Sequence, residues 1–391
     1  MRIVYLAFIE TDISNACLIH TREVAEHMAS LGHHVTVVLP RPLNIQVWKN
    51  VKHIWIKYWG FDRPREWVFF VESALRILYR HNRQGFDILY VREMERNPVL
   101  LFLALFMKCP LFVEVNGWLL DDLALTGATA DRIAAAKEHQ QKLFDLAKGI
   151  AVSTIGNAER IGSTYNIPKS KISVQELGVN IEYFTPGPQN NARWQLGLST
   201  EHQIILFAGS FHPHHDLKTL IEAFSLTLTD SKNALLLLLG TGSQISDLKQ
   251  VIKHFHIEDH VLLPGVRSYN EMPTWFQAAD IAVLPLTSAK IRQQNGCLAL
   301  KLWEYMASGL PVVATDLPGT RSALLLSDKI VIVPPEDPPS MGHALVRLLN
   351  SQHIRREIGV AGTDYVRRNR TWQRAASETL DFIEQRLQDH P

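Results

Sequence analysis

Short apolar runs alternate with amphipathic segments along the first half of the chain. Consecutive apolar positions predict strands buried on both faces, at residues 3–8, 35–39, 51–56, 88–91, 111–115 and 150–152. Helical periodicity predicts helices between them, at residues 18–30, 66–81, 99–107 and 132–147. Strands that alternate with helices indicate a doubly wound α/β domain, in which a parallel sheet is covered on both sides.

The same alternation restarts after a break. The break is residues 185–191, TPGPQNN, whose prolines, glycine and amides are typical of a linker. Beyond it we predict strands at residues 204–207, 235–239, 261–263, 281–284, 312–314 and 330–333. We predict helices at residues 217–226, 244–255, 298–307, 341–349, 354–368 and 372–387. A length of 391 residues suits two such domains. Facing each other, the two would enclose a cleft lined by loops at the carboxyl ends of their strands.

Charge and cysteine content exclude several classes of function. The formal net charge of +1 gives no argument for a nucleic-acid partner. Cys17, Cys109 and Cys297 are far apart and odd in number, which indicates neither a disulfide framework nor a zinc cluster, so we expect a reduced, cytoplasmic setting. The apolar stretch at residues 98–107 has about half of the ~20 residues that a membrane-spanning helix needs. We therefore predict no transmembrane segment, and the N-terminal run predicts a buried strand rather than a signal peptide.

Residues 209–216 lie between a predicted strand and a predicted helix. Gly209 permits close approach of the backbone to a bulky anion, and a helix N-terminus presents free N–H groups, so this loop predicts a diphosphate site. An ordinary strand-to-helix turn is the alternative. His212, His214 and Asp216 are also chemically capable of binding a metal ion, but the sequence contains no matching ligand cluster elsewhere.

The segment CLALKLWEYMASGLPVVATD, residues 297–316, combines a predicted helix with a buried strand. Lys301 and Glu304 are three positions apart and therefore share one face of that helix. A carboxylate at this place can accept hydrogen bonds from ribose hydroxyls, whereas the alternative is a surface ion pair.

Ordered motifs decide between these alternatives. LKLWEYMASGLPVVATDLPG resembles the donor-site signature of the family 4 glycosyltransferases, and GSFHPHHDLKTLIEAF resembles their phosphate loop. IHTREVAEHMASLGHHVTVVLP and TWQRAASETLDFIEQRL resemble their opening and closing helices. The resemblance implies the GT-B fold, with two Rossmann-like doubly wound domains facing a central cleft. The domains would be residues 1–186, completed by a C-terminal helix at 371–391 that crosses back, and residues 187–370, which bind the donor.

The resemblance also implies roles for particular residues at the donor. Glu304 matches the second of two glutamates common in the family, and Gly296 stands at the position of the first. Ser210 and His215 stand where an arginine and a lysine usually contact the diphosphate, so we expect His215 to help when protonated. The implied donor-binding residues are Gly209, Ser210, His212, His215, Val266, Arg267, Arg292, Gly296, Lys301 and Glu304.

In the first domain, many members of this family place a histidine after the fifth strand, facing the sugar. Asn116 takes that place here, and strand alternation puts Glu114 on the same face. Asparagine can orient a hydroxyl but cannot act as a general base, a function that Glu114 can serve only if it points into the cleft. The candidate catalytic residues are Asn116, Glu114 and Lys301.

Aromatic side chains and arginines gather between residues 48 and 83, in a composition that suits a membrane interface. A core helix with a solvated basic face is the alternative. The aromatic residues are Trp48, Trp55, Trp59, Trp67, Phe69 and Phe70.

The sequence thus predicts a retaining glycosyltransferase of cell-surface polysaccharide or glycolipid synthesis. Its partners would be a nucleoside diphosphate sugar, a saccharide or lipid-linked acceptor and the inner face of the membrane, without nucleic acid, cofactor or metal. The alternatives are a non-catalytic sugar-nucleotide-binding protein and a nucleotide-sugar epimerase.

Overall fold

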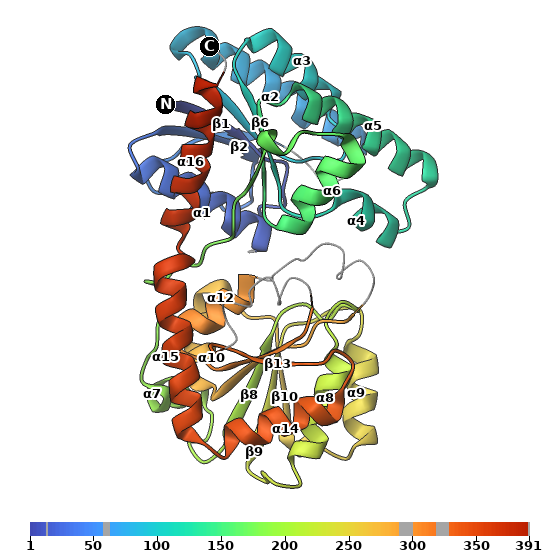
Figure 1. Cartoon of the computed structure of the whole chain (residues 1–391), viewed down its shortest axis with the longest axis vertical. Helices are drawn as coiled ribbons and strands as arrows, with labels where there is room; N and C mark the ends of the chain where they lie inside the picture. Colours follow the sequence, from blue (N-terminus) through green and yellow to red (C-terminus); the bar gives the residue numbers. More distant parts are fainter. Residues whose placement is uncertain (13–14, 58–62, 289–299, 318–327, 390–391) are drawn as a thin grey trace. The chain divides into compact units, whose positions relative to one another are not determined.

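The computed structural model describes residues 1–12, 15–57, 63–288, 300–317 and 328–389, apart from the side chains of residues 63–65 and 125. The chain forms two compact units (Figure 1): unit 1 comprises residues 1–177 and 372–391, and unit 2 comprises residues 178–371. The end of the chain thus returns to the first unit, as the resemblance implies. The division falls before the predicted linker, and helix α7 (Gln189–Leu196) begins inside that linker.

Unit 1 is built on a seven-stranded parallel sheet with the order β3-β2-β1-β4-β5-β6-β7. The strands are β1 (Arg2–Leu6), β2 (His34–Pro40), β3 (Lys52–Ile56), β4 (Ile88–Arg92), β5 (Leu111–Val115), β6 (Gly149–Val152) and β7 (Ile172–Val174). The inner strands are buried along nearly their whole length, which explains their continuous apolar runs.

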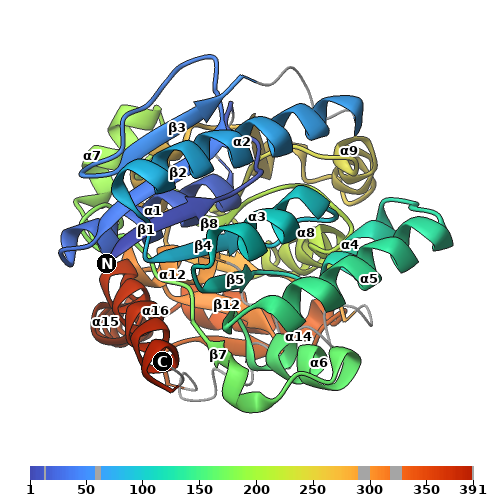
Figure 2. The ribbon, with the colours of Figure 1, turned by 90° about the horizontal axis from the view of Figure 1, so that it is seen from above.

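Helices cover both faces of this sheet. On one face α1 (Ala16–Ser30) packs against α16 (Trp372–Gln388). On the other face α2 (Arg63–Gln84), α3 (Pro98–Met107) and α5 (Ala130–Leu146) follow one another side by side (Figure 2). The shorter helices α4 (Leu119–Leu125) and α6 (Ile155–Tyr165) complete the unit.

Unit 2 is built on a six-stranded parallel sheet with the order β10-β9-β8-β11-β12-β13. The strands are β8 (Gln203–Ala208), β9 (Ala234–Leu239), β10 (Val261–Gly265), β11 (Ile281–Leu284), β12 (Val312–Thr315) and β13 (Val331–Val333). One face carries the core formed with α8 (Leu217–Thr227), α9 (Ile245–His254) and α14 (Pro338–Leu349). The other carries the core formed with α10 (Met272–Ala278), α12 (Leu300–Ala307) and α15 (Gln352–Asn369).

The predicted elements are present with small changes in their bounds, and five short elements were missed by the periodicity. The missed strand β7 has three half-buried residues and therefore leaves no apolar run. The missed helices α4, α6, α7 and α10 have 7–11 residues each, too few for a clear helical period.

Candidate functional site

The strand order of unit 2 reverses between β8 and β11. The loop that follows β8 is hydrogen-bonded there to the residues that follow β11. The loop at residues 209–216 follows β8. The backbone N–H of Asp216 donates to the Pro285 carbonyl at 2.9 Å, and that of Thr287 donates to the His214 carbonyl at 3.2 Å. Doubly wound sheets bind ligands at such switch points. The loop predicted to hold a diphosphate therefore lies at the position where this kind of sheet offers a site.

Gly209 makes room for the ammonium group of Lys301. Its φ is +153°, and a Cβ atom there would lie 2.0 Å from Lys301 Nζ. The hydroxyl of Tyr305 accepts a hydrogen bond from the Ala208 N–H at 2.8 Å and fixes the end of the strand. A residue without a side chain is thus required where the cation from α12 meets the loop.

The contacts of His215 determine which of its ring nitrogens carries the proton. Nδ1 lies 2.7 Å from the carbonyl oxygen of Ser210, which only accepts, so Nδ1 is the donor. Nε2 lies 3.1 Å from Lys301 Nζ, whose ammonium only donates, so Nε2 is the acceptor. The arrangement holds a neutral imidazole and opposes the protonated His215 expected from the sequence, since a second N–H would face the ammonium.

Helix α8 begins at Leu217, as predicted, but its first turn has a partner of its own. Asp216 is the N-cap, and its carboxylate accepts from the Thr219 N–H at 3.2 Å. An N-cap carboxylate already interacts with the positive end of a helix. The positive charge that this loop offers a ligand therefore comes from Lys301 more than from α8.

Glu304 lies one helical turn after Lys301 on α12. Burial raises the pKa of the Glu304 carboxyl to about 7, although the Lys301 ammonium and a hydrogen bond with Tyr269 oppose that rise. A carboxyl with such a pKa changes protonation in the neutral range, so its strength as a hydrogen-bond acceptor depends on pH.

Three other predicted donor residues fall within the described part of the chain, and their contacts are separate from those of Lys301. His212 is exposed, and its Nδ1 lies 3.3 Å from Ser243 Oγ. Val266 is exposed, and Arg267 lies over the Trp275 ring at 5.4 Å. The structure thus brings together Gly209, Ser210, His215, Lys301 and Glu304. Arg292 and Gly296 lie outside the described residues.

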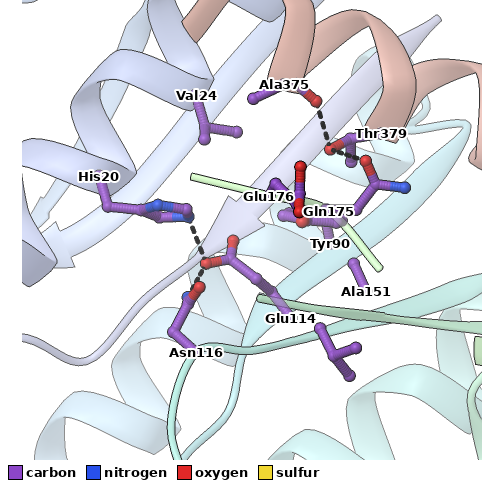
Figure 3. Close-up of a pocket in the computed structure, with 11 residues that line it drawn as sticks. His20, Val24, Tyr90, Glu114, Asn116, Ala151, Gln175, Glu176, Ala375 and Thr379 are labelled. Carbon is purple, nitrogen blue, oxygen red and sulfur yellow. Dashed lines mark hydrogen bonds and ion pairs between the residues drawn. The ribbon is translucent and has the colours of Figure 1, made fainter. Parts of the chain in front are cut away.

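In unit 1, Glu114 of β5 is the centre of a buried polar cluster (Figure 3). Its Oε1 lies 2.6 Å from His20 Nε2 and accepts a hydrogen bond from Asn116 Nδ2. The same oxygen lies 3.2 Å from Arg92 Nη1. Its Oε2 accepts from the Tyr5 hydroxyl at 2.5 Å. The Glu114 side chain is 5% exposed, so these donors take the place of water.

These partners decide the charge of Glu114. Burial alone would raise the pKa of its carboxyl, but the nearby His20 imidazole and Arg92 guanidinium outweigh burial and hold that pKa well below its usual range. A carboxylate that binds a proton so weakly is a poor general base. The geometry therefore favours a positioning role for Glu114 over the base function weighed from the sequence.

Sequence reasoning missed the three residues that surround Glu114. Tyr5 and Arg92 carry polar groups within apolar strand runs, and His20 lies on the inner face of α1. A polar side chain inside a buried strand needs a partner, and that was the available signal.

The aromatic region separates into core and surface. Trp48, Phe69 and Phe70 are buried, as the core alternative requires, whereas Trp59 lies outside the described residues. Exposed apolar side chains instead follow the outer faces of α2 and α3. They are Trp67, Val68, Val71, Leu75, Tyr79, Phe102, Leu105 and Phe106.

Two absences concern the part of the chain that the structure describes. There, no group of three or more histidine, cysteine, aspartate or glutamate side chains is arranged to hold a metal ion. Within the same residues, every helix is too short or too polar to cross a membrane.

Two family models match the chain. The model described as "Glycosyl transferases group 1" matches residues 202–351, and the model described as "Glycosyltransferase Family 4" matches residues 19–183. The D-inositol 3-phosphate glycosyltransferase of Thermobispora bispora is 24% identical over 349 residues, which cover 84% of this chain and 80% of that protein.

Solved structures are similar over the whole length. Sucrose-phosphate synthase from Thermosynechococcus elongatus matches with a TM-score of 0.78 and 17% identity, covering 100% of both chains. Anabaena HepE in complex with UDP-glucose matches with a TM-score of 0.74 and 13% identity, covering 98% of this chain and 99% of its own. At such identities the likeness concerns the fold, and it confirms the pair of Rossmann-like doubly wound domains expected from the sequence.

Proposed function

Because the chain belongs to the group 1 and family 4 glycosyltransferases, whose models together match more than half of it, we propose that it uses a nucleoside diphosphate sugar as donor and transfers the sugar with retention. The observation that supports this proposal is the contact of the Lys301 ammonium with the Gly209 loop at the switch point of unit 2. A fixed cation there stabilises the negative charge that the leaving diphosphate gains in the transition state.

The proposed reaction breaks the bond between the anomeric carbon and the donor phosphate and forms a bond to an acceptor hydroxyl oxygen. The acceptor proton passes to the departing phosphate, so no protein base is required. Lys301 and the loop N–H groups bind the diphosphate, and Glu304 accepts hydrogen bonds from the ribose. This mechanism uses neither a cofactor nor a metal ion, and activity should persist with a chelator.

Donor binding can be tested before any acceptor is known. The first ligand to test is UDP-glucose, which HepE binds in its solved complex. A thermal-shift series with uridine, guanosine and adenosine diphosphate sugars should raise the melting temperature for one nucleotide, since a ligand at 100 times its Kd stabilises by about 2.7 kcal/mol. Stabilisation by none of them would contradict the proposal. Product analysis then separates sugar transfer from epimerisation.

For the acceptor, we propose a saccharide or a lipid-linked saccharide of cell-surface polysaccharide or glycolipid synthesis. The relative from Thermobispora bispora is named for a smaller acceptor, D-inositol 3-phosphate, so that compound belongs in the same assay. Turnover with inositol 3-phosphate but with no saccharide would replace the proposed acceptor class.

A surface of unit 1 supports contact with the inner face of a membrane. We define the α2–α3 patch as Trp67, Val68, Val71, Leu75, Tyr79, Phe102, Leu105 and Phe106. On α3 the outward side chains Phe102, Leu105 and Phe106 are 62%, 65% and 60% exposed, although the opposite face of this helix is buried in the core. A helix that is apolar on all sides normally has both faces covered.

The charges beside the patch favour an anionic lipid surface as its partner. Arg83 on α2 and Lys108 after α3 are exposed, and Arg83 lies 4.9 Å from the Tyr79 ring, whereas Arg76 is paired with Glu72. Aromatic and aliphatic side chains flanked by cations suit the boundary between lipid headgroups and acyl chains.

Sedimentation with vesicles tests this contact. The wild-type protein should sediment with vesicles that contain anionic lipid and remain in solution with neutral ones. Leu105→Glu with Phe106→Glu should abolish the effect, whereas Trp194→Glu, an exposed residue of unit 2, should not. A concentration-dependent dimer that the double variant abolishes would assign the patch to a second copy instead.

A further inference from the structure

The amide group of Asn116 has a fixed orientation. Its Nδ2 is hydrogen-bonded to Oε1 of Glu114. Because Glu114 is ionised, its oxygens only accept, so the NH₂ end of the amide must face them. The amide oxygen Oδ1 is then turned away from Glu114, and among the described residues no donor is bonded to it.

The carboxylate that fixes this amide is itself held on both oxygens. His20 and Arg92 contact Oε1, and the Tyr5 hydroxyl donates to Oε2. Tyr5 is in turn packed edge to face against Tyr90, with ring centroids 4.9 Å apart. Rotation of the Glu114 carboxylate would break at least one of these contacts in a buried site, so the carboxylate is a rigid support.

Asn116 lies where a substrate can reach its oriented amide oxygen. Asn116 directly follows β5 at the carboxyl end of the sheet, and its side chain is half-buried, so a ligand can reach it. Glu114, two residues earlier on the same face, lines a small cavity together with His20, Thr379 and Asn116 (Figure 3). Substrates of doubly wound sheets bind at this edge.

We propose that Glu114 is a positioning residue that acts through Asn116, presenting the amide oxygen to a hydroxyl group of a sugar substrate. His20, Arg92 and Tyr5 serve the same end by fixing Glu114. The inference rests on the proposed transferase function. The hydroxyl belongs either to the transferred sugar of the donor or to the acceptor, and both carry the same O–H donor.

A double-mutant cycle tests the indirect action of Glu114. Glu114→Gln offers an amide in place of a carboxylate and should lower kcat/KM roughly tenfold, as expected for the loss of one oriented hydrogen bond. Asn116→Ala should cost at least as much. In the Asn116→Ala background, Glu114→Gln should have no further effect, because the group it positions is gone.

Two arms of the experiment identify the source of the hydroxyl. A rise in the donor KM, with weaker binding of UDP-sugar but unchanged binding of UDP, assigns it to the transferred sugar. A rise in the acceptor KM with unchanged donor binding assigns it to the acceptor. The matched control is Glu23→Gln, which removes another buried glutamate of unit 1 and should leave kcat/KM unchanged.

The contrary outcomes are distinct. An equal loss from Glu114→Gln in the wild-type and Asn116→Ala backgrounds, or full activity of Glu114→Gln, would overturn the inference and leave the transferase function intact. A wild-type protein that binds no nucleotide sugar and transfers none would overturn both. Thermal unfolding of every variant shows whether a loss comes from unfolding of unit 1.

Discussion

Each unit holds a charged side chain near the carboxyl edge of its sheet, and the two charges have different surroundings. In unit 1 the carboxylate of Glu114 accepts from a guanidinium, a hydroxyl and an amide and contacts an imidazole. In unit 2 the ammonium of Lys301 contacts a neutral imidazole and lies against the backbone of a glycine. The Glu304 carboxyl, one turn away, has a pKa raised to about 7 by burial, so it is only partly ionised near neutral pH.

This difference separates charge that organises the protein from charge that acts on a ligand. The charge of Glu114 is balanced by Arg92 in contact with it, so its remaining effect is to orient its neighbours. The Lys301 ammonium lies beside the His215 ring and beside the loop that we propose for the diphosphate, and it also interacts with the partly ionised Glu304 carboxyl. The attraction between the Lys301 ammonium and a bound anion would be stronger in a site of low polarity than in water.

The comparison predicts that loss of the unit 1 charge is mainly a loss of stability. Glu114→Ala leaves Arg92, His20 and Tyr5 buried around a missing acceptor and should cost about 3–5 kcal/mol of unfolding free energy. Urea unfolding followed by circular dichroism measures this cost. The depressed pKa of Glu114 means that its stabilisation is present above the unfolded-state value of about 4.3 and is lost as pH falls. The difference between the two proteins should therefore shrink in acid, and a constant difference would contradict the ionised state.

Loss of the unit 2 charge should instead act on catalysis. Lys301→Ala should lower kcat/KM by about 10²–10³-fold, the range found when one group that stabilises transition-state charge is removed. Its unfolding free energy should change far less than that of Glu114→Ala. The control Lys249→Ala removes an exposed cation of α9 and should leave the kinetics unchanged. Full activity of Lys301→Ala would assign the diphosphate to other groups.

Gly209→Ala should disturb the same cation without removing it. The new methyl group would lie 2.0 Å from Lys301 Nζ and force the ammonium aside, in addition to strain from φ of +153°. We expect kcat/KM to fall about tenfold, in line with a cost of about 1–3 kcal/mol for such strain. Gly197→Ala is the control, since Gly197 has a positive φ with open space around it. Equal effects in both variants would reduce the role of Gly209 to backbone conformation.

The smallest expected effect is a change of donor affinity with pH. Ionised Glu304 accepts hydrogen bonds from ribose better than its protonated form does, and it forms as pH rises through about 7. The affinity for UDP-glucose should therefore increase a few-fold, by roughly 2–5 times, from pH 6 to pH 8, and Glu304→Gln should remove the dependence. Calorimetric titration measures both. Tighter binding at lower pH would instead support the protonated His215 expected from the sequence.

The sequence predicted most of the fold because its signals are local. The bounds predicted for α8 and α16 differ from the structure by one residue each, since both helices have a clear apolar face and a defined start. It also predicted which residues surround Lys301, because the loop and α12 carry family motifs. The sequence indicated the aromatic residues of the α2 region but not which of their side chains are exposed, since periodicity cannot tell which apolar face of a helix is covered.

The chemistry of the site depends on contacts between distant positions and was therefore less predictable. His215 and Lys301 are 86 residues apart, and their contact favours a neutral histidine, whereas the sequence alone led us to expect a protonated one. Tyr5 and Glu114 are 109 residues apart, and neither position alone indicates a hydrogen bond that helps to hold a carboxylate ionised. Propensity and spacing describe what one segment prefers, whereas a protonation state belongs to the assembled cluster.

The return of α16 to unit 1 has a consequence for the order in which the protein is made. Trp372 lies 5.3 Å from the His20 ring and Phe382 lies 6.3 Å from the Phe112 ring, measured between ring centroids. A ribosome therefore completes every residue of unit 2 before it supplies the helix that covers one face of unit 1. Unit 1 is therefore the first unit to be started and the last to be completed. Until α16 is made, the face of unit 1 that α16 covers, which includes α1, stays exposed.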